Sequence, residues 1–217
     1  MSEPHTPRYS VVEEIANSVT HGLGALLSLV GLAVLLERSV RHGSTVQVFS
    51  SLVFGLSLLA LYLSSTLYHA LRNPAAKAVL RRLDHAAIFL LIAGSYTPFT
   101  LVTLRGPWGW SIFAVVWALA LVGLFFEAAL RRRWVGWSVG LYIGMGWVAV
   151  AAVAPLYAAL PRTGFVLLFA GGMSYTLGTV LYLARRLPFN HAWWHLAVLC
   201  GSALHYAAVL LCVVPRF

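Results

Sequence analysis

The stretch "HAWWHLAVLCGSALHYAAVLLCV", residues 191–213, decides the fold. It contains no aspartate, glutamate, lysine or arginine. About 20 predominantly apolar residues are enough for a helix to cross the hydrocarbon core of a bilayer. The stretch therefore predicts a transmembrane helix. Its first turns carry two histidines four residues apart, His191 and His195.

The rest of the chain is also predominantly apolar. Of its 217 residues, 60% are hydrophobic and 10% are charged, and the mean hydropathy is +0.84. Soluble globular domains carry about 25% charged residues, so this composition indicates an integral membrane protein. The net charge of +9 does not indicate a nucleic-acid partner, because the arginines separate apolar runs and do not form one basic patch.

Seven apolar runs are long enough to cross a membrane, and short polar or Pro- and Gly-containing breaks separate them. We predict an all-α fold, a seven-transmembrane helix bundle that forms a single domain over residues 1–217. The predicted spans are 19–37, 45–69, 84–104, 108–128, 135–159, 163–184 and 191–213. Residues 1–18 precede the first span, and within them residues 8–18 form either a short helix along the membrane interface or a frayed tail.

The basic residues predict the orientation. If the N-terminus is cytoplasmic, ten lysines and arginines fall on the cytoplasmic side: Arg8, Arg72, Lys77, Arg81, Arg82, Arg131, Arg132, Arg133, Arg185 and Arg186. Five fall outside: Arg38, Arg41, Arg105, Arg162 and Arg216. Short cytoplasmic loops are enriched in basic residues, so we expect a multi-pass protein of the bacterial inner membrane with a cytoplasmic N-terminus.

Two further patterns concern packing. Gly140 and Gly144 form a small-xxx-small pair, which lets helices approach closely either within the bundle or in a homodimer. Cys200 and Cys212 are twelve residues apart on one predicted helix, about 18 Å, which is too far for a disulfide.

Four ionisable residues are predicted to lie at one depth. His69 ends the second span, Asp84 begins the third, and His191 and His195 begin the seventh. Because successive spans alternate in direction, all four come to the cytoplasmic boundary. Charged and ionisable groups in spans are costly and usually functional.

This set of residues suggests a metal site. Two histidines at positions i and i+4 share a helix face and can bind one ion. Three protein ligands with an open fourth position are typical of catalytic zinc, which neutral imidazole suits. Asn190 is expected to cap the last helix. His205 lies about 15 Å deeper along the same helix and is not expected to be a ligand.

Four motifs resemble one family. "EEIANSVTHGLG" (13–24), "SSTLYH" (64–69), "LDHAAIFLLIAGSYTPF" (83–99) and "HAWWHLAVLCGSALHY" (191–206) are similar to the hemolysin III family. This family belongs to the progestin and adipoQ receptor superfamily, which includes the adiponectin receptors. The resemblance implies a seven-span bundle with a cytoplasmic N-terminus and a Zn²⁺ ion near the inner face.

The resemblance also implies roles for individual residues. The metal ligands are then His69, His191 and His195, and the catalytic candidates are Asp84 and Ser65. A pattern at Glu14, Asn17, Thr20 and His21 braces the N-terminal segment or supports the metal ligands.

The leading functional hypothesis is a zinc-dependent, ceramidase-like hydrolase. It would act on an amide or ester bond of a membrane lipid at the inner leaflet, with Asp84 as general base and acid. One alternative is a non-enzymatic regulator or receptor with a structural zinc, which contributes to membrane homeostasis through lipid binding. A pore-forming hemolysin is disfavoured because the polar residues gather at one end of the bundle. A transporter would need ionisable groups at the bilayer midplane, where His205 is the one candidate.

Overall fold

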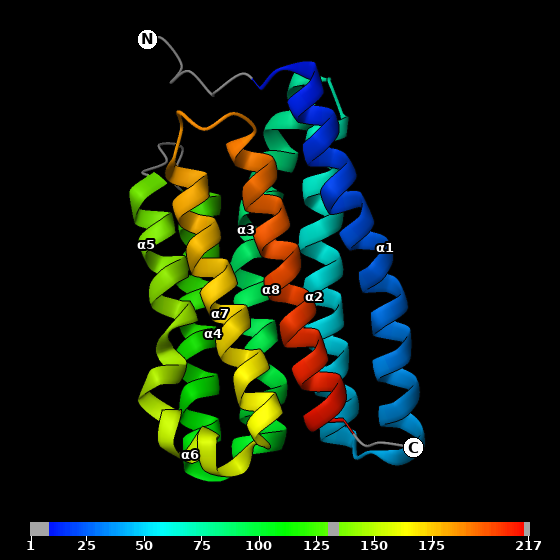
Figure 1. Cartoon of the computed structure of the whole chain (residues 1–217), viewed down its shortest axis with the longest axis vertical. Coiled ribbons are helices and arrows are strands. Elements are labelled where there is room, and N and C mark those ends of the chain that lie inside the picture. The colour runs from blue at the N-terminus through cyan, green and yellow to red at the C-terminus, as the bar shows by residue number, and fades with distance from the viewer. Residues whose placement is uncertain (1–8, 130–134, 215–217) are drawn as a thin grey trace.

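The computed structural model describes residues 9–129 and 135–214, and this part of the chain is helical with no β-strand. Seven of its helical segments are long and apolar enough to cross a membrane, which confirms the predicted seven-helix bundle (Figure 1). Six of these spans contain one long helix each, namely α1 (Val11–His42), α2 (Thr45–Ala70), α3 (Pro74–Pro98), α4 (Gly106–Ala129), α7 (Arg162–Leu183) and α8 (Asn190–Cys212), and the fifth span begins with the shorter α5 (Val135–Gly146).

The first helix begins earlier than predicted. Ser10 and Glu13 form a capping box in which each side chain accepts a hydrogen bond from the other's backbone N–H. No helix breaker follows, so residues 11–18 are the first turns of α1. The predictions of a separate interfacial helix or of a frayed tail over 8–18 are both wrong for the described residues of this segment.

The third and fifth spans also differ from their predicted shapes. Asn73 caps α3 and Pro74 occupies its first turn, so this helix begins ten residues before the predicted start at Asp84. It ends in a π-helical segment, η1 (Phe99–Leu104). The fifth span consists of α5, the 3-10 segment η2 (Val148–Ala152) and α6 (Val153–Ala159).

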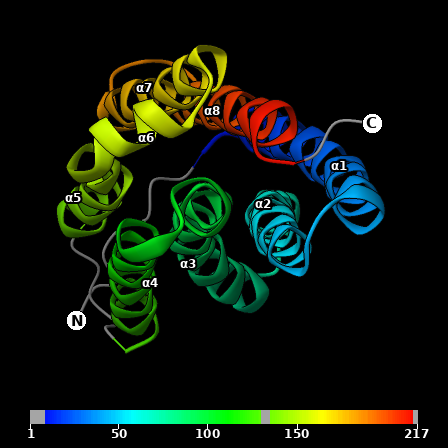
Figure 2. The same ribbon diagram turned by 90° about the horizontal axis from the view of Figure 1, so that it is seen from below.

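Seen from one end, α5, α7, α8 and α1 follow one another along one side of the bundle, and α4, α3 and α2 face them (Figure 2). α8 lies between α1 and α7, and α3 lies between α2 and α4. Glycines allow several of these contacts: a Cβ at Gly24 would come 2.5 Å from the Tyr62 ring, and one at Gly94 would come 2.6 Å from the Cβ of Ser57. α1 therefore packs closely on α2, and α2 packs closely on α3.

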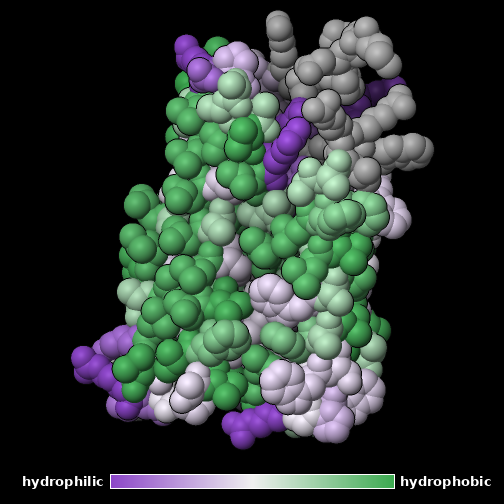
Figure 3. Space-filling view, turned by 180° about the vertical axis from the view of Figure 1, so that it is seen from behind, coloured by the Kyte–Doolittle hydropathy of each residue, from purple (hydrophilic) through white to green (hydrophobic). Residues whose placement is uncertain are grey.

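The outer surface suits a lipid environment. Large apolar side chains are exposed along every spanning segment, for example Leu26, Leu121 and Val180. In Figure 3 the middle of the visible face is predominantly hydrophobic, and the hydrophilic residues gather toward its two ends. Such a surface would be unstable in water and is stable against lipid tails.

Gly140 and Gly144 do not pack within the bundle. Both are exposed on α5, and a Cβ added at either would meet no atom within 4 Å. The expectation that this pair serves close packing inside the bundle is therefore wrong. The homodimer contact remains a prediction.

Gly94→Ala is expected to destabilise the bundle by about 1–3 kcal/mol, because the added methyl overlaps Ser57 and must push α2 from α3. The loss of secondary structure during titration with a denaturing detergent measures this effect. Gly140→Ala is the matched control, since it adds the same methyl in open space and is expected to leave stability unchanged or slightly higher. Equal stability of the two variants would contradict the packing described here.

Candidate functional site

Three histidines meet at one end of the bundle. His69 lies at the end of α2, and His191 and His195 lie in the first turns of α8. Each offers one ring nitrogen, and these atoms all lie within 4.8 Å of one another. All three side chains are buried. This cluster, His69, His191 and His195, is called the histidine cluster below, and it can hold a metal ion.

The start of α8 places two of these histidines. Phe189 adopts the left-handed conformation (φ 56°) at the N-cap position, and Asn190 is the first helical residue. The Asn190 side chain donates a hydrogen bond to the carbonyl of Tyr182 at 2.9 Å, which ties the start of α8 to the end of α7. The expectation that Asn190 caps α8 is therefore wrong, and its amide anchors the preceding turn.

The hydrogen bonds of His69 and His195 indicate which nitrogen each offers. His195 Nδ1 lies 3.1 Å from the carbonyl oxygen of Asn17 and 3.3 Å from Thr20 Oγ1. His69 Nδ1 lies 2.5 Å from Glu14 Oε2. A carbonyl or carboxylate oxygen only accepts, so Nδ1 is the donor in both rings and Nε2 keeps its lone pair. This arrangement is typical of metal-ligating histidines.

A charged pair supports His69 from outside the histidine cluster. Lys77 Nζ donates to Glu14 Oε1 at 2.7 Å and to the carbonyl of Tyr68 at 3.1 Å. Glu14 therefore bridges Lys77 and His69, and connects α1, α2 and α3. The histidines face each other closely as well, because His69 Nε2 and His191 Nε2 are 3.2 Å apart.

The polar atoms around the histidine cluster fit a bound ion and its ligands. Buried atoms without a protein hydrogen-bond partner gather there: Asn17 Oδ1 and Nδ2, Ser65 Oγ and His191 Nδ1. Ser65 is completely buried, one helical turn from His69. Buried polar groups normally have partners, so this concentration indicates that the site is completed by groups other than protein.

His21 and Asp84 lie on the inner side of the cluster. The His21 ring stacks on the His195 ring, with centroids 3.5 Å apart and planes 11° apart. Asp84 is buried and lines the same cavity as His191 and His195. The structure thus brings every predicted site residue to one end of the bundle: Glu14, Asn17, Thr20, His21, Ser65, His69, Asp84, His191 and His195. The roles assigned to them remain predictions.

Two residues of the site escaped sequence reasoning. The sequence places Lys77 among the basic residues that predict membrane orientation, and the structure shows that it also donates a hydrogen bond to Glu14. Tyr9, in the segment before α1, packs its ring against His191 with centroids 5.0 Å apart. Burial raises the pKa of the Tyr9 hydroxyl, so this hydroxyl stays protonated over the cluster. Neither contact has a local sequence signal, because both depend on where α1 lies.

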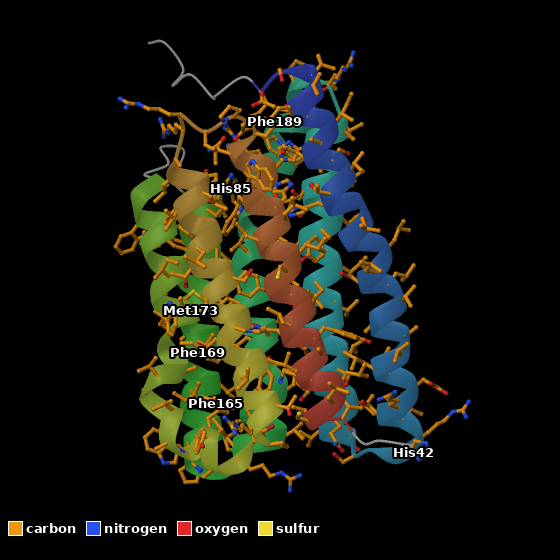
Figure 4. The ribbon with its side chains drawn as sticks, viewed as in Figure 1. His42, His85, Phe165, Phe169, Met173 and Phe189 are labelled. Carbon is orange, nitrogen blue, oxygen red and sulfur yellow. The ribbon has the colours of Figure 1, made fainter. Side chains whose placement is uncertain are left out.

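A cavity of about 400 Å³ extends from the histidine cluster into the bundle. His21, Asp84, His191 and His195 line one end, and most of the remaining wall is apolar, including Leu91, Ile112, Leu156 and Phe165. His85 and Phe165, which both line it, are labelled toward opposite ends of the bundle in Figure 4. The cavity therefore joins a polar end to a long apolar interior.

Glu14→Gln is expected to weaken metal binding about 10- to 100-fold, because the neutral amide no longer pairs with Lys77 and supports the His69 ring less well. Competition with a chromophoric zinc chelator measures the affinity. Glu37→Gln is the control, since Glu37 is an exposed carboxylate paired with Arg41 near the other end of α1. An unchanged affinity in Glu14→Gln would show that Glu14 does not support the ligand.

Comparisons with known proteins identify relatives of the whole chain. The family described as Haemolysin-III related matches residues 9–206. The chain is 48% identical to Hemolysin-3 of Bacillus cereus over 94% of each chain, and 45% identical to the Hemolysin-3 homolog of Bacillus subtilis over 96% of this chain and 99% of that one. It is 27% identical to the human monocyte to macrophage differentiation factor over 95% of this chain and 87% of that one. No solved structure matches the chain.

Proposed function

Because the chain belongs to the haemolysin-III related family and is a multi-pass integral membrane protein, we propose that it is a zinc-dependent hydrolase of membrane lipids. One observation carries the proposal: two of the three buried histidines of the cluster, His191 and His195, line the polar end of a long apolar cavity. A lipid has the matching shape, with a polar bond near its headgroup and a hydrocarbon chain beyond it.

The histidine cluster would hold the metal. Three neutral imidazoles suit zinc, and the absence of a thiolate from the cluster does not count against it. When bound, zinc supplies a Lewis acid that polarises a carbonyl and activates water at neutral pH. Glu14 and Asn17 keep the rings of His69 and His195 oriented for this task.

Asp84 and Ser65 are proposed to handle protons and hydrogen bonds. The Asp84 carboxylate accepts a proton from the attacking water and returns it to the leaving amine or alcohol, acting as general base and then general acid. The Ser65 hydroxyl has no hydrogen-bond partner among the described residues and can hydrogen-bond to an oxygen of the reacting group. The apolar wall excludes other water, which strengthens these polar interactions.

The membrane placement is also a proposal. The basic-residue count supports a cytoplasmic N-terminus in the bacterial inner membrane, with the histidine cluster near the inner leaflet, from which the substrate enters. In a cysteine-free background, Arg185→Cys in the exposed α7–α8 connection should react with an impermeant maleimide only from the cytoplasmic side. Labelling from the outside of intact cells would show that the α7–α8 connection and the N-terminus lie outside, contrary to the proposed orientation.

Purified protein in lipid nanodiscs tests the activity. The zinc-loaded protein is expected to hydrolyse a fluorogenic N-palmitoyl amide or p-nitrophenyl palmitate, to lose this activity on chelation and to regain it with zinc. His195→Ala serves as the blank for contaminating esterases. If the protein binds zinc but hydrolyses these substrates no faster than His195→Ala, the proposal of a hydrolase is wrong. The ion would then have a structural role.

A pore-forming function has less support. The Bacillus relatives have the word hemolysin in their names, but the cavity of this chain is mostly apolar. A water-filled pore needs a polar lining from one end to the other.

A further inference from the structure

A second buried histidine position lies far from the histidine cluster. His205 follows His195 by ten residues on α8, about 15 Å along the helix axis. This is half the thickness of a bilayer core, which is about 30 Å. Its side chain is buried. Ionisable residues at this depth are expensive and usually serve a function.

The ring of His205 has one nitrogen without a partner. Its Nε2 lies 3.1 Å from the carbonyl oxygen of Leu168, so Nε2 donates, and a neutral ring then offers Nδ1 as an acceptor. Nδ1 has no hydrogen-bond partner in the described chain. A Cβ at Gly171 would come 2.6 Å from Nε2, so the edge that carries Nε2 faces α7 and Nδ1 lies on the opposite side of the ring.

A hydrogen-bonded group of three hydroxyls lies around Ser202, one helical turn before His205 on α8. Tyr62 donates a hydrogen bond to Ser202 Oγ at 2.7 Å, and the Tyr175 hydroxyl lies 2.8 Å from the same oxygen. The Tyr175 ring lies edge-on to His205, with centroids 5.4 Å apart. His205 and Tyr175 both line the cavity. The apolar cavity therefore has a polar patch midway along its wall.

A packing role alone does not explain this patch. A buried acceptor without a partner is costly, and leucine or phenylalanine would fill the same space without that cost. The unmet acceptor calls for a donor that comes from a molecule in the cavity. In an apolar, membrane-embedded cavity this molecule is a lipid, and its donor has to lie along the hydrocarbon chain.

We propose that His205 and Tyr175 form a second binding subsite that recognises a hydroxyl group on the chain of a bound lipid. The hydroxyl donates to His205 Nδ1 and lies beside the Tyr175 hydroxyl. A depth of ~15 Å below the histidine cluster corresponds to about the twelfth carbon of an extended chain. The inference rests on the proposed function in one respect, that the cavity receives a lipid chain.

Competition binding tests the subsite without catalysis. Displacement of radiolabelled stearic acid from protein in nanodiscs gives the affinities of stearic, 12-hydroxystearic and 2-hydroxystearic acid. In His205→Phe, the affinity of 12-hydroxystearic acid relative to stearic acid is expected to fall about tenfold, because the hydroxyl loses its acceptor. The relative affinity of 2-hydroxystearic acid is expected to stay constant, since its hydroxyl lies at the polar end.

Further variants separate the subsite from misfolding. Tyr175→Phe should lower the ratio of the affinity for 12-hydroxystearic acid to the affinity for stearic acid, but less than His205→Phe does. Tyr157→Phe, which removes a hydroxyl from an exposed ring outside the cavity, should leave it unchanged. If stearic acid binds but the ratio is the same in His205→Phe, the subsite is wrong and the hydrolase stands. If no fatty acid binds wild type, both proposals fail.

Discussion

Replacing His195 with alanine is expected to reduce bound zinc from about one ion per chain to background. His195 is almost completely buried, and its Nδ1 donates to the carbonyl of Asn17, so Nε2 is available to the ion. Structural zinc sites in zinc-finger peptides bind the ion with about 10–16 kcal/mol. Losing one of three protein ligands removes at least ~3 kcal/mol, or more than a hundredfold in affinity.

Plasma mass spectrometry of the purified protein measures this loss. His69→Ala and His191→Ala are expected to behave in the same way, because each removes one member of the histidine cluster. His205→Ala is the matched control, since it removes another buried histidine of the same helix about 15 Å away and should retain the ion. Zinc retained in all three cluster variants, or absent from well-folded wild type, would end the metal-site proposal.

The bundle itself follows from the apolar runs. In lipid, every backbone N–H and C=O must be satisfied within the protein, and a helix does this with its own residues. A continuous apolar run such as 191–213 therefore crosses the membrane as a helix. The alternation of spans then brings the end of α2 and the start of α8 to one side, which is why His69, His191 and His195 could be predicted to lie level.

Helix ends and irregular segments were harder to predict. The capping box at Ser10 and the Asn73–Pro74 start extend α1 and α3 through residues whose polarity resembles that of a loop. Hydropathy marks where a helix enters the bilayer and not where it begins. The change from α5 to η2 near Trp147 occurs within a continuous apolar run, so hydropathy contains no signal for it.

The supporting parts of the site depend on contacts across the whole chain. Lys77 and Glu14 are 63 residues apart in sequence, and their pairing requires α1 to lie against α2 and α3. Gly140 and Gly144 form a packing pattern in the sequence, but no described atom lies within 4 Å of a Cβ added at either position. The cavity is the space that seven helices leave unfilled, and the periodicity of one helix says nothing about such a space.

Asp84→Asn is expected to lower kcat for the palmitoyl substrates by about 10²- to 10⁴-fold while the protein keeps its zinc. Asparagine has the size of aspartate and can still hydrogen-bond, but its amide cannot accept and return a proton. Asp84 lines the cavity beside His191 and His195 and is not a member of the histidine cluster, so the ion is expected to stay. Zinc content and hydrolysis are measured on the same preparation.

Two comparisons make the Asp84 result specific. Glu127→Gln neutralises a different buried carboxylate, on α4 and outside the cavity lining, and is expected to hydrolyse at the wild-type rate. Ser65→Ala removes the proposed hydrogen bond to the reacting group without changing proton transfer, so its loss of kcat should be smaller than that of Asp84→Asn. If Asp84→Asn lost zinc as well, Asp84 would be a ligand; if it hydrolysed at the wild-type rate, another group would carry the proton. A slow, zinc-loaded Asp84→Asn separates metal binding from proton transfer, and this separation distinguishes a hydrolase from a bundle that zinc only stabilises.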